Sequence, residues 1–541
     1  MKKCLATSLI LVVSASVLFT GCSKNNSNTD TASATKNGKN ASSTAEINTT
    51  GYPIVKDKVT LNFVSPKNPM APSFGDMTFF KNLENQSNVH IEWNNIPSDG
   101  YQEKKNILIA TNDLPDAFYN AQFTDFDLIK LGGEGTIIPL EKLIDQYMPN
   151  LKALFEKRPD LKAIVTAPDG HIYSLPYAEE MNLINMPNQM FINKAWLDKL
   201  NLKMPTTLDE YHDVLKAFKD NNVNGKGTVI PLSFWFQGWC GNEGDLLGMF
   251  GAPDVTQDDH RIVKDGKVLY SVALPEYKEA IAYFHKWYEE GLIDPEFATV
   301  DAQKLQAKGK TADETLGSFI WWEGPEIVGE SRMKDYALLP PLKNKEGNIV
   351  IGKTNYSEYT RDSFVITKAN KSPEITARWV DQLYDPKTGI QAHWGPIGEV
   401  YKEENGKLVN LPVPDGTTAG EYRNKVAPGG PLAVTKDQFG TLVDMEPRAK
   451  QRLDELQKYY FPYQVKENYP FVFLPADELE KVNQIETQLK EYTKQMKAKW
   501  LMDGGIENDW DSYLKKLDQI GLKDYLTIYQ NAYDNFKKNN K

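Results

Sequence analysis

Cysteine is scarce in this chain of 541 residues, which contains only Cys4, Cys22 and Cys240. Cys4 and Cys22 lie at the two ends of an N-terminal apolar stretch, so Cys240 has no evident partner for an internal disulfide. We therefore expect the folded part to be held by hydrophobic cores alone. A chain of this length can achieve this, and two large lobes are expected.

Blocks of basic residues and long apolar runs are also absent from the body of the chain. The formal net charge is −11, and no cluster of lysine and arginine stands out, which argues against a nucleic-acid partner. No long apolar run occurs between Tyr52 and Lys541, so we expect the function to lie outside the membrane.

The sequence lacks the common catalytic motifs. Its six histidines are scattered without metal-ligand spacing. There is no H-E-x-x-H, nucleophile elbow, P-loop or dinucleotide fingerprint. We therefore expect that the protein is not an enzyme.

The N-terminus has the pattern of an export signal. Lys2 and Lys3 precede an apolar run at 4–19, which is too short to span a bilayer and is followed by Thr20-Gly21-Cys22. This ending resembles the lipobox of bacterial lipoproteins, in which the cysteine is acylated and becomes the mature N-terminus. The resemblance implies a cleaved signal peptide at 1–21, and lipid attached to Cys22 that anchors the protein on the extracellular face of the cell membrane.

The next segment, 22–51, has the composition of a flexible tether. From 23 to 50 it is almost entirely Ser, Asn, Thr, Ala, Lys and Gly, with no aromatic residue. Such a chain would let a folded body move about three nanometres from the membrane.

Strand and helix patterns alternate along the body. Strands are predicted at 58–64, 90–93 and 114–118, and helices at 79–86 and 101–110, which indicates an α/β fold with a largely parallel sheet. Further helices are predicted to open with a capping box at Thr207 and with Pro275 at the first helical position. Three more are predicted near the C-terminus, at 479–496, 511–520 and 524–537.

Several segments together resemble the extracellular solute-binding proteins of ABC sugar importers, family 1 type, including the subgroup that takes oligosaccharides. They are 169–176, 191–200, 205–211, 288–297, 509–513 and 529–533. The resemblance implies a periplasmic-binding-protein-like fold, in which two α/β lobes are joined by crossing strands and close on ligand like a hinge. It places 52–177 plus 358–399 in an N-terminal lobe, and 178–357 plus 400–541 in a C-terminal lobe.

Aromatic residues, 11% of the chain, are the main candidates for binding sugar. A pyranose ring has an apolar face that packs on flat aromatic side chains. The candidates in Gly- and Pro-flanked segments are Trp235, Trp239, Trp321, Trp322 and Trp394. Because adjacent residues of a strand face opposite ways, one of Trp321 and Trp322 should face the cleft, and the family resemblance favours Trp322. Trp287, Trp379 and Trp500 are instead expected in the core.

Polar side chains could bind the sugar hydroxyls. Glu323 and Arg361 are candidates for hydroxyl groups or a uronic carboxylate, although each could equally form a salt bridge. Tyr359 lies beside Arg361, while Asp116 and Asn120 follow a predicted strand end, where ligands collect in open α/β sheets.

One loop resembles the first half of a calcium-binding loop. Asp220, Asn222 and Asn224 have the spacing of its first three ligands, but Thr228 and Val229 occupy the family's later acidic positions. We therefore expect no cofactor and favour a loop that has lost its metal over a weak calcium site.

Together these patterns predict a monomeric, lipid-anchored receptor that captures an oligosaccharide and delivers it to the permease subunits of an ABC transporter. Two alternatives stay open. One is an exported glycoside hydrolase, which needs two carboxylates about 5–10 Å apart that no sequence pattern would mark. The other is a lipoprotein that binds peptides in its cleft.

Overall fold

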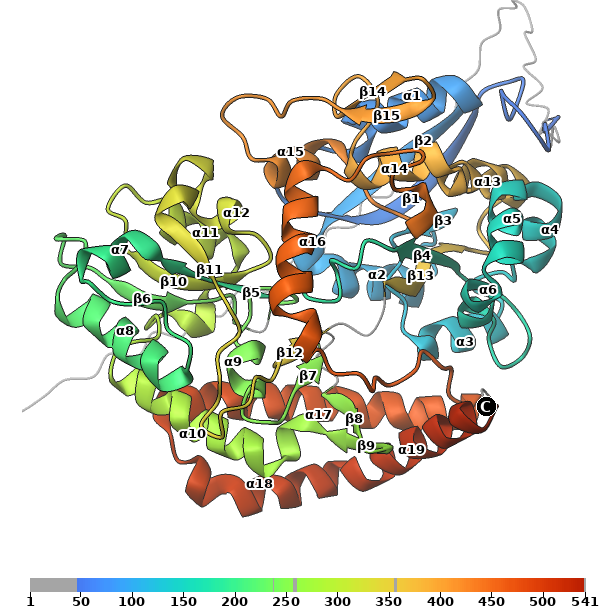
Figure 1. Ribbon diagram of the computed structural model, residues 1–541. Helices are drawn as coiled ribbons and strands as arrows, with labels where there is room; N and C mark the ends of the chain where they lie inside the picture. The colour runs from blue at the N-terminus through green and yellow to red at the C-terminus, as the bar shows by residue number, and fades with distance from the viewer. Residues whose placement is uncertain (1–45, 237, 256–259, 355–357, 540–541) are drawn as a thin grey trace, which may run out of the picture. The chain divides into compact units, whose positions relative to one another are not determined.

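Two β-sheets, each with its own hydrophobic core, organise the chain (Figure 1). The structure is a computed structural model and describes residues 46–236, 238–255, 260–354 and 358–539. The predicted signal at 1–21, Cys22 and most of the predicted tether lie outside the described residues. Among the described residues, no helix combines the length and the apolar character needed to cross a membrane.

The first sheet has six strands in the order β16-β4-β13-β3-β1-β2. Its strands are β1 (Val59–Lys67), β2 (Val89–Pro97), β3 (Ala117–Tyr119), β4 (Leu175–Glu179), β13 (Tyr359–Ile366) and β16 (Ala433–Val434). The β1–β2, β1–β3 and β4–β16 pairs are parallel, whereas β13 is antiparallel to both β3 and β4. Five of the six strands, β1, β2, β3, β4 and β16, therefore run in one direction, as predicted for a largely parallel sheet. The strand β13 runs the other way, because the chain leaves after β4 and re-enters from the opposite end.

We call this sheet and the helices that follow its strands the first lobe. The helices are α1 (Thr78–Ser87), α2 (Tyr101–Ala110), α3 (Asp125–Gly133), α4 (Glu141–Tyr147), α5 (Pro149–Lys157), α6 (Pro159–Val165), α13 (Pro373–Asp381), α14 (Pro386–Trp394) and α15 (Ala419–Val426). A hairpin of β14 (Tyr401–Glu404) and β15 (Lys407–Asn410) completes it.

The second lobe is built on a four-stranded sheet in the order β11-β5-β10-β6. Its strands are β5 (Gln189–Asn193), β6 (Ile230–Ser233), β10 (Leu316–Trp321) and β11 (Tyr336–Leu339). Its helices are α7 (Lys194–Lys199), α8 (Leu208–Asp220), α9 (Gly244–Gly248), α10 (Pro275–Glu289), α11 (Ala302–Lys310) and α12 (Gly324–Val328). Two small ribbons pair β7 (Asp254–Val255) with β12 (Lys353–Thr354) and β8 (Arg261–Lys264) with β9 (Lys267–Tyr270).

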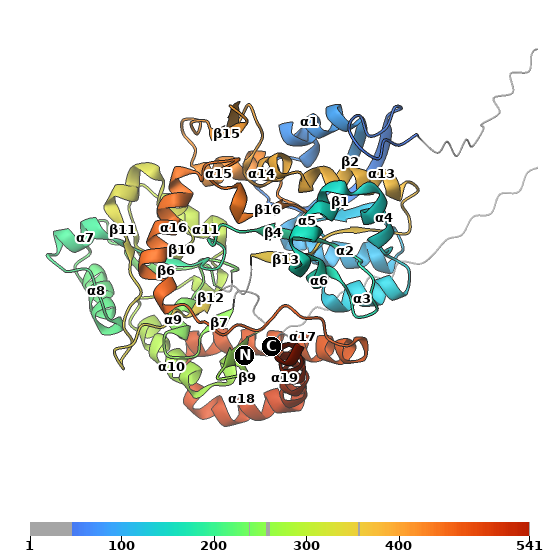
Figure 2. The ribbon, with the colours of Figure 1, turned by 45° about the vertical axis from the view of Figure 1, so that its right-hand side comes forward.

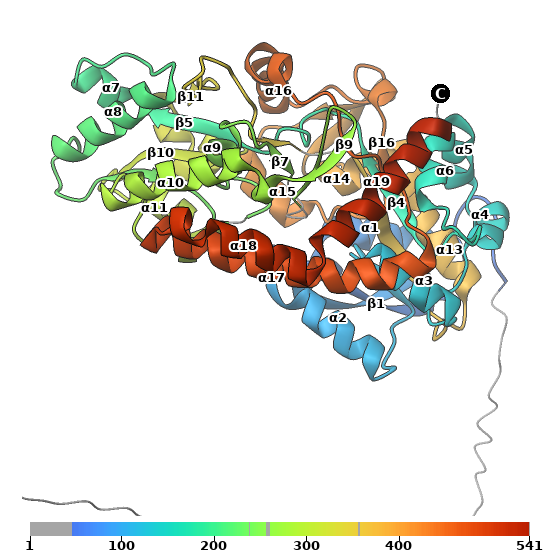
Figure 3. The same ribbon diagram turned by 90° about the horizontal axis from the view of Figure 1, so that it is seen from below.

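Four helices form the C-terminal part of the second lobe. They are α16 (Pro447–Tyr459), α17 (Ala476–Asp503), α18 (Ile506–Ile520) and α19 (Leu522–Asn539). In Figure 1 α16 lies between the two sheets, and in the turned view of Figure 2 it overlaps the sheet of the second lobe. Figure 3 shows α17 and α18 running along the underside, where α17 contacts both α10 and α3. The helix α17 therefore spans from the second lobe to the first.

Local signals in the sequence set the ends of several helices. The hydroxyl of Thr207 accepts a hydrogen bond from the backbone N–H of Glu210 at the start of α8, as predicted. The carboxylate of Glu210 reaches one residue further back than a capping box requires, to Thr206. Pro275 is the first residue of α10, and Gly521, with φ of 122°, separates α18 from α19.

The segment between β14 and β16 differs from the predicted division into lobes. The family resemblance placed 400–541 in the C-terminal lobe. In the structure β16 pairs with β4, and Tyr401, Leu408 and Val443 are buried in the core of the first lobe. The chain therefore passes between the lobes after β4, before β13 and before α16, and this last crossing lies more than forty residues later than the boundary at 400.

The three tryptophans that were predicted to be core residues are core residues. Trp287, Trp379 and Trp500 are at most 1% exposed. Trp379 packs edge-on against Phe63 of β1 in the first lobe, while Trp287 and Trp500 belong to the core of the second.

Candidate ligand-binding cleft

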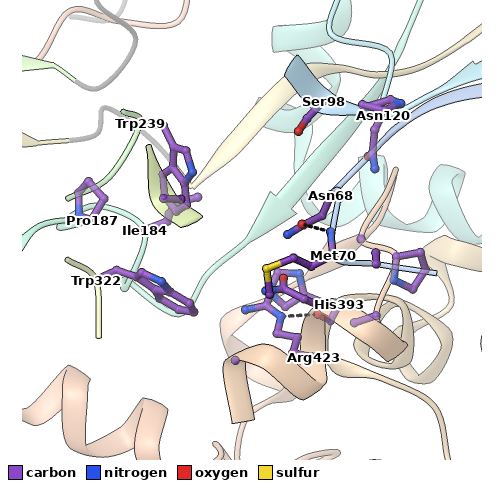
Figure 4. A pocket seen from close by; sticks show the side chains of 18 of the residues that line it. Asn68, Met70, Ser98, Asn120, Ile184, Pro187, Trp239, Trp322, His393 and Arg423 are labelled. Carbon is purple, nitrogen blue, oxygen red and sulfur yellow. Dashed lines mark hydrogen bonds between the residues drawn. The ribbon is translucent and has the colours of Figure 1, made fainter. Parts of the chain in front are cut away.

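A cavity of about 980 Å³ lies between the two lobes and is lined by residues of both. This is the size range of sites that hold small organic ligands. In Figure 4 Trp239 and Trp322 of the second lobe lie across the space from Asn120, His393 and Arg423 of the first.

The wall from the second lobe is rich in indole rings. Trp235, Trp239, Trp321 and Trp322 all line the cavity, and Trp239 is 53% exposed. Trp321 is buried as the last residue of β10 and packs against Trp235 at 6.0 Å between ring centroids. Trp322 is only half-buried and its ring reaches into the cavity (Figure 4). The two neighbours therefore differ in burial, but both line the cavity, so the predicted preference for Trp322 as the ligand-binding ring stays a prediction.

The two adjacent indoles share one acceptor. Glu326 lies in α12, the helix that begins directly after them, and its Oε2 accepts the N–H of Trp321 at 3.0 Å and that of Trp322 at 2.8 Å. Glu326 is 4% exposed, and burial raises its pKa above the ordinary value for glutamate. The two hydrogen bonds fix the rings relative to each other.

Two arginines from α16 lie against this wall and also line the cavity. The guanidinium of Arg448 pairs with Glu323 and also bonds Glu446 at 3.2 Å. That of Arg452 lies 5.1 Å from the Trp322 ring centroid and donates to the carbonyl of Met186 at 3.0 Å. Burial raises the pKa of Glu323 to about 7, although both guanidinium groups act in the opposite direction. Glu323 lines the cavity and is at the same time a salt-bridge partner.

The wall from the first lobe is more polar. Arg423 of α15 donates to the backbone carbonyl and to the Nε2 of His393, each at 2.8 Å. Because a guanidinium can only donate, the Nε2 of His393 is an acceptor and its proton is on Nδ1. Burial lowers the pKa of His393 well below its ordinary value, which agrees with a neutral ring. Trp394 and Asn120 also line this side.

Three predicted site residues do not line the cavity. Arg361 is 3% exposed, with its guanidinium 3.6 Å from the Phe473 ring centroid. Asp116 accepts the backbone N–H of Asn62 at 2.7 Å and holds β1. Tyr359 pairs with Ala178 in the first sheet. Their charges and rings join parts of the protein to each other, away from the cavity.

The calcium-like loop is closed by bonds within the protein. The Oδ1 of Asn222 accepts from Gly227 N at 2.8 Å, and that of Asn224 accepts from Lys226 N at 3.1 Å. The amino group of Lys226 lies 3.1 Å from Asp313 Oδ1. Among the described residues there is no group of three or more acidic, histidine or cysteine side chains that could hold a metal ion. Asp220 is the one carboxylate among the three predicted ligands, which is too little charge for a tight calcium site, so the loss of metal stays a prediction.

Sequence reasoning missed several charged residues of the two cavity walls. Glu326, Arg423, Arg448 and Arg452 line the cavity but come from short or unpredicted helices. The spacing of Trp322 and Glu326, one helical turn, was the one signal available for Glu326. Nothing in the sequence connects α16 to the rings, because that contact is made in the fold alone.

Comparison with known proteins gives consistent relatives. The model of the family "Bacterial extracellular solute-binding protein" matches residues 72–390. The fructooligosaccharide ABC transporter substrate-binding protein FusA of Streptococcus pneumoniae is 38% identical over 93% of this chain and 95% of its own length. Lipoprotein LipO of Bacillus subtilis is 26% identical over 65% of this chain and 69% of its own length.

Solved structures agree in fold. FusA of S. pneumoniae in complex with kestose has a TM-score of 0.84 at 37% identity, and the match covers 89% of this chain and all of that one (100%). An EF-hand mutant of FusA in complex with fructo-nystose has the same TM-score of 0.84. With two α/β lobes, a cavity between them and these relatives, the chain belongs to the bacterial extracellular solute-binding proteins.

Proposed function

We propose that this protein is the receptor of an ABC importer and captures a neutral oligosaccharide of the fructooligosaccharide class. The observation that carries the proposal is the interlobe cavity, with four indoles on one wall and polar groups opposite. It is supported by the 38% identity to a fructooligosaccharide-binding relative.

Sugar recognition accounts for both walls. The faces of sugar rings pack on the half-buried Trp322 and the exposed Trp239, whose flat apolar surfaces would otherwise be in contact with water. The hydroxyl groups bind to polar side chains such as Asn120. Closure of the two lobes removes both surfaces from water, and the ligand favours the closed form through this difference in affinity.

The charges of the cavity favour a neutral sugar over an acidic one. Its cationic side chains are already bonded to protein acceptors: Arg423 to His393, Arg448 to Glu323, Arg452 to Met186 O and Lys67 to backbone carbonyls. A uronic carboxylate would have to break one of these bonds and would also face the buried Glu179 and Glu323.

The remaining features of the proposal follow the family and the sequence. The protein acts as a monomer anchored through lipid on Cys22, delivers its cargo to the permease subunits and catalyses no reaction. The loop at 220–229 holds no calcium, in contrast to an EF-hand in the FusA relative.

Calorimetric titration with kestose and nystose tests the proposal. We expect saturable binding of these sugars, no binding of galacturonic acid oligomers, and no increase in reducing ends after prolonged incubation. New reducing ends would identify a hydrolase instead. Silence with every sugar, together with an increase in melting temperature on adding peptides, would identify a peptide receptor.

A further inference from the structure

We propose that Glu326 is a positioning residue that fixes the Trp321–Trp322 indole pair and joins it to α15 across the cleft. The proposal rests on the proposed function, because it assigns to a buried residue of the cavity wall a role in closure of the lobes around the sugar.

Trp321 and Trp322 share one hydrogen-bond acceptor. A single carboxylate oxygen accepts both indole N–H groups, at 3.0 and 2.8 Å, and Glu326 itself is 4% exposed. Buried indole N–H groups are costly without an acceptor. Moving Glu326 would therefore either leave two donors unsatisfied or carry both rings along.

The other oxygen of the same carboxylate faces α15. Oε1 of Glu326 is buried and has no hydrogen-bond partner among the described residues. It lies against the backbone of Gly420 in α15, where a β-carbon would be 1.7 Å from it. Only glycine leaves room for this oxygen, so the carboxylate and α15 fit closely in this arrangement of the lobes.

Two further contacts make this a defined meeting point. Lys310 of α11 in the second lobe pairs with Glu421, the neighbour of Gly420, at 2.5 Å. On its other side α15 is bonded to α14 through Arg423 and His393. Rings, carboxylate, α15 and the polar wall therefore form one connected chain of contacts across the cavity.

Three variants test the assignment with kestose as the probe. Glu326→Gln should shift the two indole N–H resonances, assigned with Trp321→Phe and Trp322→Phe, even without sugar. It should raise the dissociation constant about tenfold, the value of one charge-assisted hydrogen bond. Gly420→Ala should raise the dissociation constant by about tenfold or more, because the added methyl group keeps α15 away from the carboxylate.

A double variant distinguishes direct coupling between Glu326 and Gly420 from a general loss of affinity. Truncating Glu326 to alanine makes room for the methyl group, so Gly420→Ala should cost much less affinity in the Glu326→Ala background than in the wild type. Lys310→Met is the matched control: it removes the neighbouring contact between lobes and should leave the indole resonances in place.

The results that would overturn the proposal are distinct from failure of the proposed function. Unshifted indole resonances in Glu326→Gln, or an equal cost of Gly420→Ala with and without Glu326, would refute the positioning role. If Gly420→Ala does not fold, the indole resonances of Glu326→Gln decide alone. If the wild type binds no sugar, the proposed function fails, while the sugar-free indole resonances still judge the role of Glu326.

Discussion

The neighbouring tryptophans at the end of β10 test which indole contributes to sugar binding and which contributes to folding stability. Trp322→Ala should weaken sugar binding and leave the fold almost unchanged, whereas Trp321→Ala should destabilise the fold. The two side chains have the same size, adjacent positions and the same hydrogen-bond acceptor. They differ in burial, since Trp321 is 4% exposed and Trp322 is half-buried.

The magnitudes follow from that difference. A sugar ring covering about 60 Å² of the Trp322 face gains about 1.5 kcal/mol at 25 cal/mol per Å². Favourable contact between sugar and indole adds to this, for a total of about 2 kcal/mol, or about 30-fold in the dissociation constant. Trp321 packs so closely that a β-carbon on Gly241 would lie 2.4 Å from its ring. Removing this ring should cost about 3–5 kcal/mol of unfolding free energy.

Calorimetric titration with kestose and urea unfolding of each variant measure the two effects. The reasoning is refuted if Trp322→Ala loses as much folding stability as Trp321→Ala, because Trp322 would then be a core residue. It is also refuted if Trp322→Ala binds kestose as tightly as the wild type.

Three further predictions concern a buried carboxyl, the closed loop and a buried arginine. The pKa of Glu323 is raised to about 7, so the folded protein holds this proton more tightly than the unfolded chain. The free energy of unfolding should therefore fall by up to about 3 kcal/mol between pH 4.5 and 7. In urea unfolding across this range, Glu323→Gln should lack that part of the decrease. Calcium or EDTA should leave the melting temperature unchanged, because the loop at 220–229 is held by its own hydrogen bonds, and a stabilisation by calcium would contradict this reading. Arg361→Met should lower the free energy of unfolding by about 1–3 kcal/mol through loss of its contacts with Asp125 and Phe473, with kestose affinity retained in calorimetry.

Local sequence patterns predicted those structural features that depend on interactions between nearby residues. The helix predicted at 101–110 has the same bounds in the structure, since its ends depend on nearby residues. Strand alternation did not predict the positions of Trp321 and Trp322, because β10 ends at Trp321 and both rings meet the same carboxylate. Trp235, Trp239 and Trp394, which the sequence offered as ligand candidates, line the cavity, although Trp394 is the last residue of α14. Their role in ligand binding stays a prediction.

What the sequence did not determine depends on distant partners. Arg361 was predicted near the ligand, but two phenylalanines more than a hundred residues later enclose it. The antiparallel direction of β13 is set by where the chain returns from the second lobe, which no local pattern records. Glu326 was not predicted because its one signal, a spacing of one helical turn from Trp322, does not reveal that both indole N–H groups meet its carboxylate.

The three passages of the chain between the lobes restrict how the protein can move. Two bodies joined by one segment could twist, slide and swing independently. Joined after β4, before β13 and before α16, and spanned underneath by α17, they keep mainly one bending motion. Opening and closing of the lobes then follow a single coordinate. A docking partner that contacts the lobes at any one point of the cleft rim therefore distinguishes the closed, ligand-bound form from the open form.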